Sequence, residues 1–188
     1  MIILQINNKK TKTMVLVSIL AALAYALMFL SFPIIPAFPF LKLDFSDLPI
    51  LIGLFMVGPL GAVEILLLKL FLYWMTMGFS IPELIGLSSS LIVSLIFILG
   101  FYLFRKDVVK HGLIRFLPVI VVAIVLAIVM SILNYFVFLP LYMKAFGFNL
   151  GIPLAKIVAL GVAPFNLIKG LVDGTIFILI FSRLKKAK

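Results

Sequence analysis

Three polar residues, Asn166, Lys169 and Asp173, lie close together in an otherwise apolar segment near the end of the chain. Their i, i+3, i+7 spacing places them along a single stripe if the segment is helical. The flanking residues are apolar enough to place this stripe inside a lipid bilayer. An ionisable side chain there costs about 2.5–3.5 kcal/mol and by default indicates a functional site. The stripe therefore predicts a binding site for a polar ligand within a membrane.

Strongly polar residues inside the apolar segments are few: Glu64, Lys69, Asn134, Asn166, Lys169 and Asp173. Asn134, Asn166 and Lys169 lie in the middle or outer part of their segments, and we expect them to converge on one pocket. Amides offer both donors and acceptors, and the ammonium adds a cationic donor. This set suits a planar ligand edge with alternating acceptors and donors, such as an imide. A structural role stays open, because Lys169 can pair with Asp173 and asparagines can link membrane helices.

The composition places the chain in a membrane. It has 188 residues, of which 65% are hydrophobic, and its mean hydropathy is +1.38. Soluble domains contain about 45–50% apolar residues, so the excess has to face lipid. A helical span needs about 20 mostly apolar residues. The sequence therefore predicts a single all-α integral membrane domain over residues 1–188, with room for six spans and little room for a soluble domain.

The apolar runs predict six transmembrane helices. The second is short, and Gly58 and Pro59 predict a tight turn from it into the third. This second helix can lie at a different depth or partly re-enter the membrane. We expect the spans at residues 13–31, 47–58, 60–78, 82–104, 114–139 and 157–182.

The distribution of charge predicts the orientation. The formal net charge of +10 is compatible with nucleic-acid binding, but Lys and Arg concentrate at the ends of the apolar runs, as the positive-inside rule describes. We therefore expect a multi-pass protein of the cell membrane with both termini and the 105–115 loop in the cytoplasm, and no nucleic-acid partner. The basic residues on that side are Lys9, Lys10, Lys12, Arg105, Lys106, Lys110, Arg115, Arg183, Lys185, Lys186 and Lys188.

Two outer loops are long and rich in aromatic residues. The first, residues 32–46, is also rich in proline, and the second, residues 140–156, contains glycines that can act as hinges. Such loops suit either an aromatic belt at the membrane interface or a lid that caps a site opening outward. Both interpretations stay open on composition.

The beginning of the chain resembles a signal peptide, because lysines precede an apolar run that contains Ala22 and Ala24 as a small-residue cleavage motif. The apolar run continues to Pro33, however, and a signal peptide has an apolar region of only about 7–15 residues. We therefore expect an uncleaved first span.

Small residues form a ridge along the first span. Ser18, Ala22 and Ala26 follow a small-xxx-small spacing, which allows two membrane helices to approach closely. The ridge can pack within this chain or against a partner helix. Gly170 and Gly174 offer a second step of this kind in the last span.

Sequence motifs for catalysis and for metal binding are absent. There is no G-x-x-x-x-G-K-[ST] phosphate loop, nucleophile elbow or paired-carboxylate arrangement. With no cysteine, disulfides and thiol chemistry are excluded. The single histidine, His111, falls in a basic loop and is expected to be solvated rather than to bind a metal. We therefore expect a protein that is not an enzyme and holds no cofactor or metal.

Two stretches resemble a known family: Leu41-Lys-Leu-Asp-Phe-Ser-Asp-Leu-Pro-Ile-Leu-Ile-Gly53, and Ala163-Pro-Phe-Asn-Leu-Ile-Lys-Gly170 with Asn134 upstream. With the six predicted spans, the basic ends, the small-residue ridge and the capping loops, they make the chain similar to the substrate-binding S components of energy-coupling factor (ECF) vitamin transporters. The two stretches look like the riboflavin-specific members in particular. The resemblance covers nearly the whole chain.

The resemblance implies a function and partners. S components bind a vitamin from outside and then associate with a transmembrane coupling protein and two cytoplasmic ATPases, which agrees with the missing phosphate loop. By resemblance the ligand is riboflavin, held at the pyrimidine edge of its isoalloxazine ring by Asn134, Asn166 and Lys169. The ridge around Ala22 and Ala26, which begins at Ser18, would contact the coupling protein.

The same resemblance implies further ligand residues. Leu43, Asp44 and Phe45 would lie near the ligand. Glu64 is a candidate for hydrogen bonds to the ribityl hydroxyls, and Tyr142 is a candidate for covering the ring.

Two alternatives stay open. An S component for another vitamin, such as thiamine or biotin, would share the fold and differ in ligand specificity. A membrane enzyme or an autonomous channel would instead use Glu64, Lys69 or Asp173 for proton or ion transfer.

Overall fold

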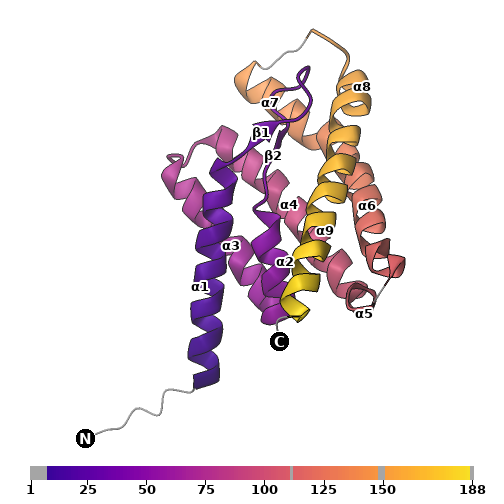
Figure 1. Ribbon diagram of the computed structural model, residues 1–188. Helices are drawn as coiled ribbons and strands as arrows, with labels where there is room; N and C mark the ends of the chain where they lie inside the picture. The colour runs from indigo at the N-terminus through magenta and orange to yellow at the C-terminus, as the bar shows by residue number, and fades with distance from the viewer. Residues whose placement is uncertain (1–7, 111, 148–150, 187–188) are drawn as a thin grey trace, which may run out of the picture.

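A computed structural model of the chain describes residues 8–110, 112–147 and 151–186, and His111 lies outside them. Long helices form a bundle that carries a small β-hairpin and helix α7 at one end (Figure 1). The elements are α1 (Asn8–Phe29), β1 (Phe32–Pro33), β2 (Lys42–Leu43), α2 (Asp47–Met56), α3 (Pro59–Thr76), α4 (Ile81–Leu103), α5 (Arg105–Val108), the 3₁₀ turn η1 (Leu113–Phe116), α6 (Leu117–Leu133), the π-helical turn η2 (Asn134–Phe138), α7 (Leu139–Phe146), α8 (Leu154–Ile157), the π-helical turn η3 (Val158–Val162) and α9 (Ala163–Lys186).

The fold is all-α, and the residues that the structure describes contain five candidate spans. The segments long and apolar enough to cross a membrane are Lys9–Phe29, Pro59–Thr76, Ile81–Leu103, Leu113–Ala145 and Leu154–Arg183. The remaining predicted span, the second one at residues 47–58, corresponds to α2, which is apolar but has only 10 residues, about half of what a span needs. Most of α2 is buried within the bundle, with Ile50 and Leu51 fully enclosed. Six crossings therefore stay a prediction.

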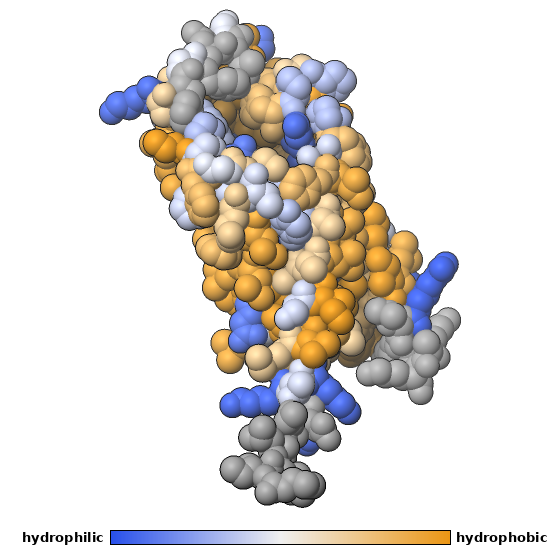
Figure 2. Space-filling model, turned by 90° about the vertical axis from the view of Figure 1, so that its left-hand side faces the viewer, coloured by the Kyte–Doolittle hydropathy of each residue, from blue (hydrophilic) through white to orange (hydrophobic). Residues whose placement is uncertain are grey.

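The surface agrees with a membrane location. Exposed side chains along the middle of the bundle are mostly apolar, and hydrophilic residues gather toward the two ends (Figure 2). The first turn of α1 and the last turn of α9 lie at the same end, together with α5, while the hairpin lies at the opposite end (Figure 1). The bundle therefore has one end that carries basic residues and one that carries the hairpin.

The ends of the helices follow local sequence signals. Gly58 has a φ of 107°, which favours glycine, and Pro59 occupies the first turn of α3, where its missing N–H costs nothing. The tight turn predicted here is confirmed. At the start of α4, the Ser80 hydroxyl accepts a hydrogen bond from the backbone N–H of Glu83. Helix α7 ends at Gly147, which has a φ of 63°.

Two π-helical turns accommodate prolines within long helices. In η2, the N–H of Leu139 donates to the carbonyl of Asn134, five residues earlier, and Pro140 follows directly. Turn η3 repeats this arrangement before Pro164. A proline ring clashes with the carbonyl four residues earlier in a regular α-helix, and a wider turn removes that clash.

The π-helical turn corrects one boundary. The sequence predicts that the fifth helix ends at residue 139 and that residues 140–156 form a loop. This prediction is wrong for residues 140–146. Turn η2 is followed directly by α7, which contains Pro140 and continues to Phe146. Within the other outer loop, residues 32–46, two residues of each arm pair as antiparallel strands, with Phe32 opposite Leu43.

Helices α6 and α9 pack with their backbones close together. A Cβ atom added to Gly170 would lie 2.5 Å from the Cα of Ala123, and one added to Gly174 would lie 2.9 Å from Cγ1 of Val119. Only glycine lets the two backbones approach this far. The small-xxx-small step predicted at these glycines is therefore used inside the bundle.

Replacing Gly170 with alanine should destabilise the protein, because the added Cβ forces α6 and α9 apart. Overpacking of this kind costs about 1–3 kcal/mol, or about 2–12 °C in Tm for a chain of this length. Thermal unfolding of the purified protein in detergent measures the change. Leu171→Ala, at the neighbouring exposed position, is the matched control. An equal Tm for the two variants would contradict the close contact.

Candidate functional site

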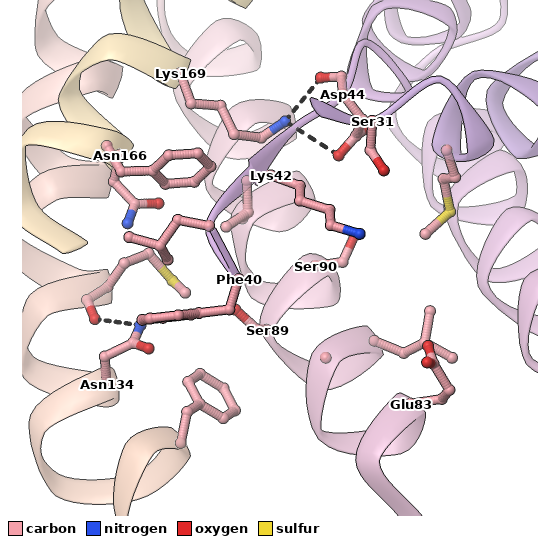
Figure 3. A pocket seen from close by; sticks show the side chains of 18 of the residues that line it. Ser31, Phe40, Lys42, Asp44, Glu83, Ser89, Ser90, Asn134, Asn166 and Lys169 are labelled. Carbon is pink, nitrogen blue, oxygen red and sulfur yellow. Dashed lines mark hydrogen bonds and ion pairs between the residues drawn. The ribbon is translucent and has the colours of Figure 1, made fainter. Parts of the chain in front are cut away.

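A cavity of about 410 Å³ lies at the hairpin end of the bundle. The end of α1, the hairpin segment and parts of α3, α4, α6, α7 and α9 contribute to its walls. Its size is in the range of pockets that enclose one small-molecule ligand. The polar residues of its lining, shown in Figure 3, are Ser31, Lys42, Asp44, Glu83, Ser89, Ser90, Asn134, Asn166 and Lys169.

The remaining walls are largely apolar and aromatic. Two tyrosines and three phenylalanines contribute rings, and Tyr142 also donates a hydrogen bond of 3.0 Å from its hydroxyl to the carbonyl of Pro82, which ties α7 to the start of α4. Such walls suit the faces of a flat ligand, since rings offer large contact areas. The aromatic lining residues are Phe40, Tyr73, Phe138, Tyr142 and Phe165.

The structure brings together five of the eight residues predicted to bind a ligand: Asp44, Asn134, Tyr142, Asn166 and Lys169. The other three are not in the lining. Leu43, in strand β2, is buried, and the ring of Phe45 packs against that of Phe32 with 6.2 Å between centroids. Glu64 is exposed on α3.

The two asparagines hold their amides in the same way. Nδ2 of Asn134 donates to the carbonyl of Met130 at 2.8 Å, and Nδ2 of Asn166 donates to the carbonyl of Val162 at 2.8 Å. Each amide nitrogen is therefore fixed on its own helix, four residues back, and Oδ1 is fixed as an acceptor. Both side chains point into the cavity (Figure 3).

Lys169 contacts oxygens from three directions. Its Nζ lies 3.1 Å from the carbonyl oxygen of Asp44, 3.1 Å from Oδ2 of Asp47 and 3.0 Å from Oδ2 of Asp173. These three contacts match the three N–H donors of an ammonium group. The pair with Asp173, four residues later, is the structural pairing that the sequence left open. Lys169 therefore belongs both to the cavity and to a buried ionic network.

Asp47 links this network to a second lysine. Its Oδ1 lies 3.8 Å from Nζ of Lys69 and accepts a hydrogen bond from the Ser94 hydroxyl. Lys69 is fully buried and also donates to the Ser46 hydroxyl at 3.0 Å. Helices α2, α3, α4 and α9 therefore meet at one carboxylate. Buried ions need such partners, because an unpaired charge in a low-dielectric interior is very costly.

The family follows from comparison with known proteins. A family model described as the substrate-specific component of ECF transporters matches residues 12–181. The chain is an ECF transporter S component. The family resemblance noted from the 41–53 and 163–170 stretches is thus confirmed.

Individual relatives agree. This S component is 37% identical over 182 residues to the riboflavin transporter RibU of Staphylococcus aureus (strain TCH60), covering 96% of this chain and 94% of the relative. It is 36% identical over 184 residues to the riboflavin transporter FmnP of Bacillus subtilis (strain 168), covering 94% and 93%. A solved structure described as the S component of a bacterial ECF transporter superposes with a TM-score of 0.77 at 35% identity, covering 94% of this chain and 97% of the other.

The small-residue ridge of this S component faces outward. Ser18, Ala22 and Ala26 are all exposed, and the Ser18 hydroxyl donates to the carbonyl of Met14 at 2.9 Å. Packing within the chain is carried by the neighbouring alanines, Ala21 and Ala24, which are buried. The ridge therefore presents a smooth face at the surface of the bundle.

Sequence reasoning missed the α4 wall of the cavity. Glu83, Ser89 and Ser90 contribute polar groups there. A run of three serines, residues 88–90, interrupts an apolar span and was the available signal. Ser94, one turn further along α4, supports the ionic network instead.

Replacing Lys69 with methionine should destabilise the S component strongly. Lys69 is not in the cavity lining, and its loss leaves the buried Asp47 with one cation instead of two. Breaking a buried ion pair costs about 3–5 kcal/mol, or about 6–20 °C in Tm, as measured by thermal unfolding in detergent. Lys156→Met removes an exposed lysine and should leave Tm nearly unchanged. A Lys69→Met variant as stable as this control would show that the network does not support the fold.

Proposed function

We propose that this S component binds riboflavin in the cavity, taking it from outside the cell for import. The convergence of Asn134, Asn166 and Lys169 on one cavity carries the proposal, because it supplies the amides and the ammonium that an imide edge requires. The relatives named riboflavin transporters, at 36–37% identity over nearly the whole chain, support the same ligand.

The proposed pose directs the pyrimidine edge of the isoalloxazine ring toward the two asparagines and Lys169. That edge presents a carbonyl, an N–H group and a second carbonyl. The Oδ1 atom of an asparagine can accept from the N–H, and the remaining amide hydrogens and the ammonium can donate to the carbonyls. The aromatic walls, including Phe165 and Tyr142, would contact the faces of the ring.

Ligand contact with Lys169 requires an exchange of partners. All three donors of its ammonium already meet oxygens at 3.0–3.1 Å. The side chains of Asp47 and Asp173 are buried and lie outside the cavity lining, whereas the third partner is the carbonyl of Asp44, a residue that lines the cavity. We propose that a flavin carbonyl replaces the Asp44 carbonyl on Lys169.

The ribityl chain would extend toward the polar groups of α4 and the hairpin. Glu83, Ser89, Ser90 and Lys42 lie on that side of the cavity (Figure 3) and offer both donors and acceptors to a row of hydroxyls. Glu64 is exposed on α3, so we propose Glu83 as the acidic residue that contacts the ribityl hydroxyls.

Replacing Asn134 or Asn166 with alanine should weaken riboflavin binding by about 1–3 kcal/mol, because each leaves a buried hydrogen bond unmade. Quenching of flavin fluorescence on titration of the purified protein measures the affinity. Ser131→Ala is the matched control, since Ser131 lies on α6 outside the cavity lining. Wild-type affinity in both asparagine variants would contradict the site.

Competition identifies the vitamin. An excess of unlabelled riboflavin should displace bound, labelled riboflavin, and the same excess of thiamine or biotin should leave the labelled riboflavin bound. Displacement by another vitamin at lower concentration than riboflavin would favour an S component of different specificity.

We further propose that the chain crosses the membrane six times, with α2 as the short second crossing and both termini in the cytoplasm. The basic residues at the α5 end and the positive-inside rule support this orientation. The exposed ridge of Ser18, Ala22 and Ala26 is the proposed contact for a transmembrane coupling protein. Two cytoplasmic ATPases would supply the energy, as the chain has no phosphate loop of its own.

Single cysteines test the orientation, because the native chain contains none. A cysteine in place of Ala37, exposed on the hairpin segment, should react with a membrane-impermeant maleimide added to intact cells. A cysteine in place of Lys110, exposed near α5, should react only after permeabilisation. The reverse pattern would invert the orientation, and labelling of both positions from outside would contradict the six-crossing topology.

A further inference from the structure

The buried ionic network contains more negative than positive groups. Two lysines, Lys69 and Lys169, face three aspartates, Asp44, Asp47 and Asp173. Two ammonium groups against three carboxylates leave one excess negative charge. Within the described part of the chain, no third cation contacts this cluster. An uncompensated charge at this depth is unfavourable, and buried groups usually avoid it by changing their protonation state.

The three carboxylates are not equally satisfied. Asp47 has partners on both oxygens: on one, a hydrogen bond from Ser94 and an ion pair with Lys69, and on the other, the ammonium of Lys169. Asp44 has a side chain that is 20% exposed, and its Oδ1 accepts hydrogen bonds from the backbone N–H and hydroxyl of Ser46. Two of the three carboxylates therefore have the partners that an ionised group needs.

Asp173 differs from both. It is fully buried, and only its Oδ2 has a partner, the ammonium of Lys169. Its Oδ1 is enclosed and has no hydrogen-bond partner among the residues that the structure describes. The tightly packed α6 contributes apolar residues next to this part of α9, including Ala123 and Val119. An ionised carboxylate would thus keep one oxygen desolvated and unpaired.

We propose that the network binds one proton and that Asp173 carries it on Oδ1. The proton brings the cluster to two positive and two negative charges. Lys169 still donates to Oδ2, which remains an acceptor in the protonated group. The titratable groups of the network are Lys169 on the same helix, Asp47 on α2, Lys69 on α3 and Asp44 before α2, while α4 contributes the uncharged Ser94. The inference concerns the protein without ligand and holds whichever vitamin it takes.

Asparagine substitutions compare the two buried carboxylates. Asp173→Asn keeps the shape and the neutral charge of the protonated group, so Tm at neutral pH should change by less than about 3 °C. Asp47→Asn removes an anion that both lysines need, so Tm should fall by about 10 °C or more. Raising the pH should also lower the wild-type Tm more than that of Asp173→Asn, because only the wild type has a proton to lose there.

Infrared spectroscopy detects the proton directly. Ordinary carboxyl groups ionise near about pH 4, so a carboxylic-acid C=O band at neutral pH identifies a protonated buried group. The band should be present in the wild type, lost in Asp173→Asn and kept in Asp107→Asn, which removes a surface partner of Lys110. Absence of the band from the wild type, or a Tm for Asp173→Asn as low as that for Asp47→Asn, would overturn the proposal. Neither readout uses riboflavin, so a failed ligand assignment leaves both tests intact.

Discussion

The buried carboxylate of Asp47 lies between the ammonium groups of two buried lysines, Lys69 and Lys169. Through it, the short helix α2 is joined to α3 by Lys69, to α4 by Ser94 and to α9 by Lys169. In a low-dielectric interior, separating these charged groups from their partners would strongly destabilise the folded protein. The arrangement explains how a helix of ten residues, too short for an ordinary span, keeps a fixed place at the centre of a membrane protein.

The cavity takes its polar groups from this framework and from the two helices beside it. Lys169 is held by the carboxyl groups of Asp47 on α2 and Asp173 on α9, and each asparagine is held by a carbonyl of its own helix. The two asparagine amides are thus oriented before a ligand arrives, and Lys169 keeps two of its three partners, which lowers the entropic cost of binding. The hairpin segment completes the wall with Phe40, Lys42 and Asp44, and its strands pair over only two residues each.

The sequence allowed much of this to be predicted, and the failures have physical causes. The long apolar runs predicted the major helices. The few polar residues inside these runs include Asn134, Asn166 and Lys169, which line the cavity. The boundary at Pro140 failed because a π-helical turn can carry a proline through a helix, which periodicity does not reveal. Glu64 was a candidate from the family resemblance, but only tertiary structure shows which face of α3 turns toward the cavity, and Glu64 lies on the exposed face. The role of Ser94 depends on contacts between residues far apart in the chain.

The glycine contact between α6 and α9 gives the cavity one rigid side. At Gly170 and Ala123 the two backbones already touch, so the helices cannot move closer, and moving apart would open a void. The asparagine-bearing wall is therefore rigid, whereas the part of the wall that the hairpin segment contributes depends on strands of two residues each. In the proposed pose, the tolerance for added substituents is then uneven around the flavin. A substituent on the edge that faces the asparagines would meet a rigid surface, and one on the hairpin side would meet a surface that can adapt.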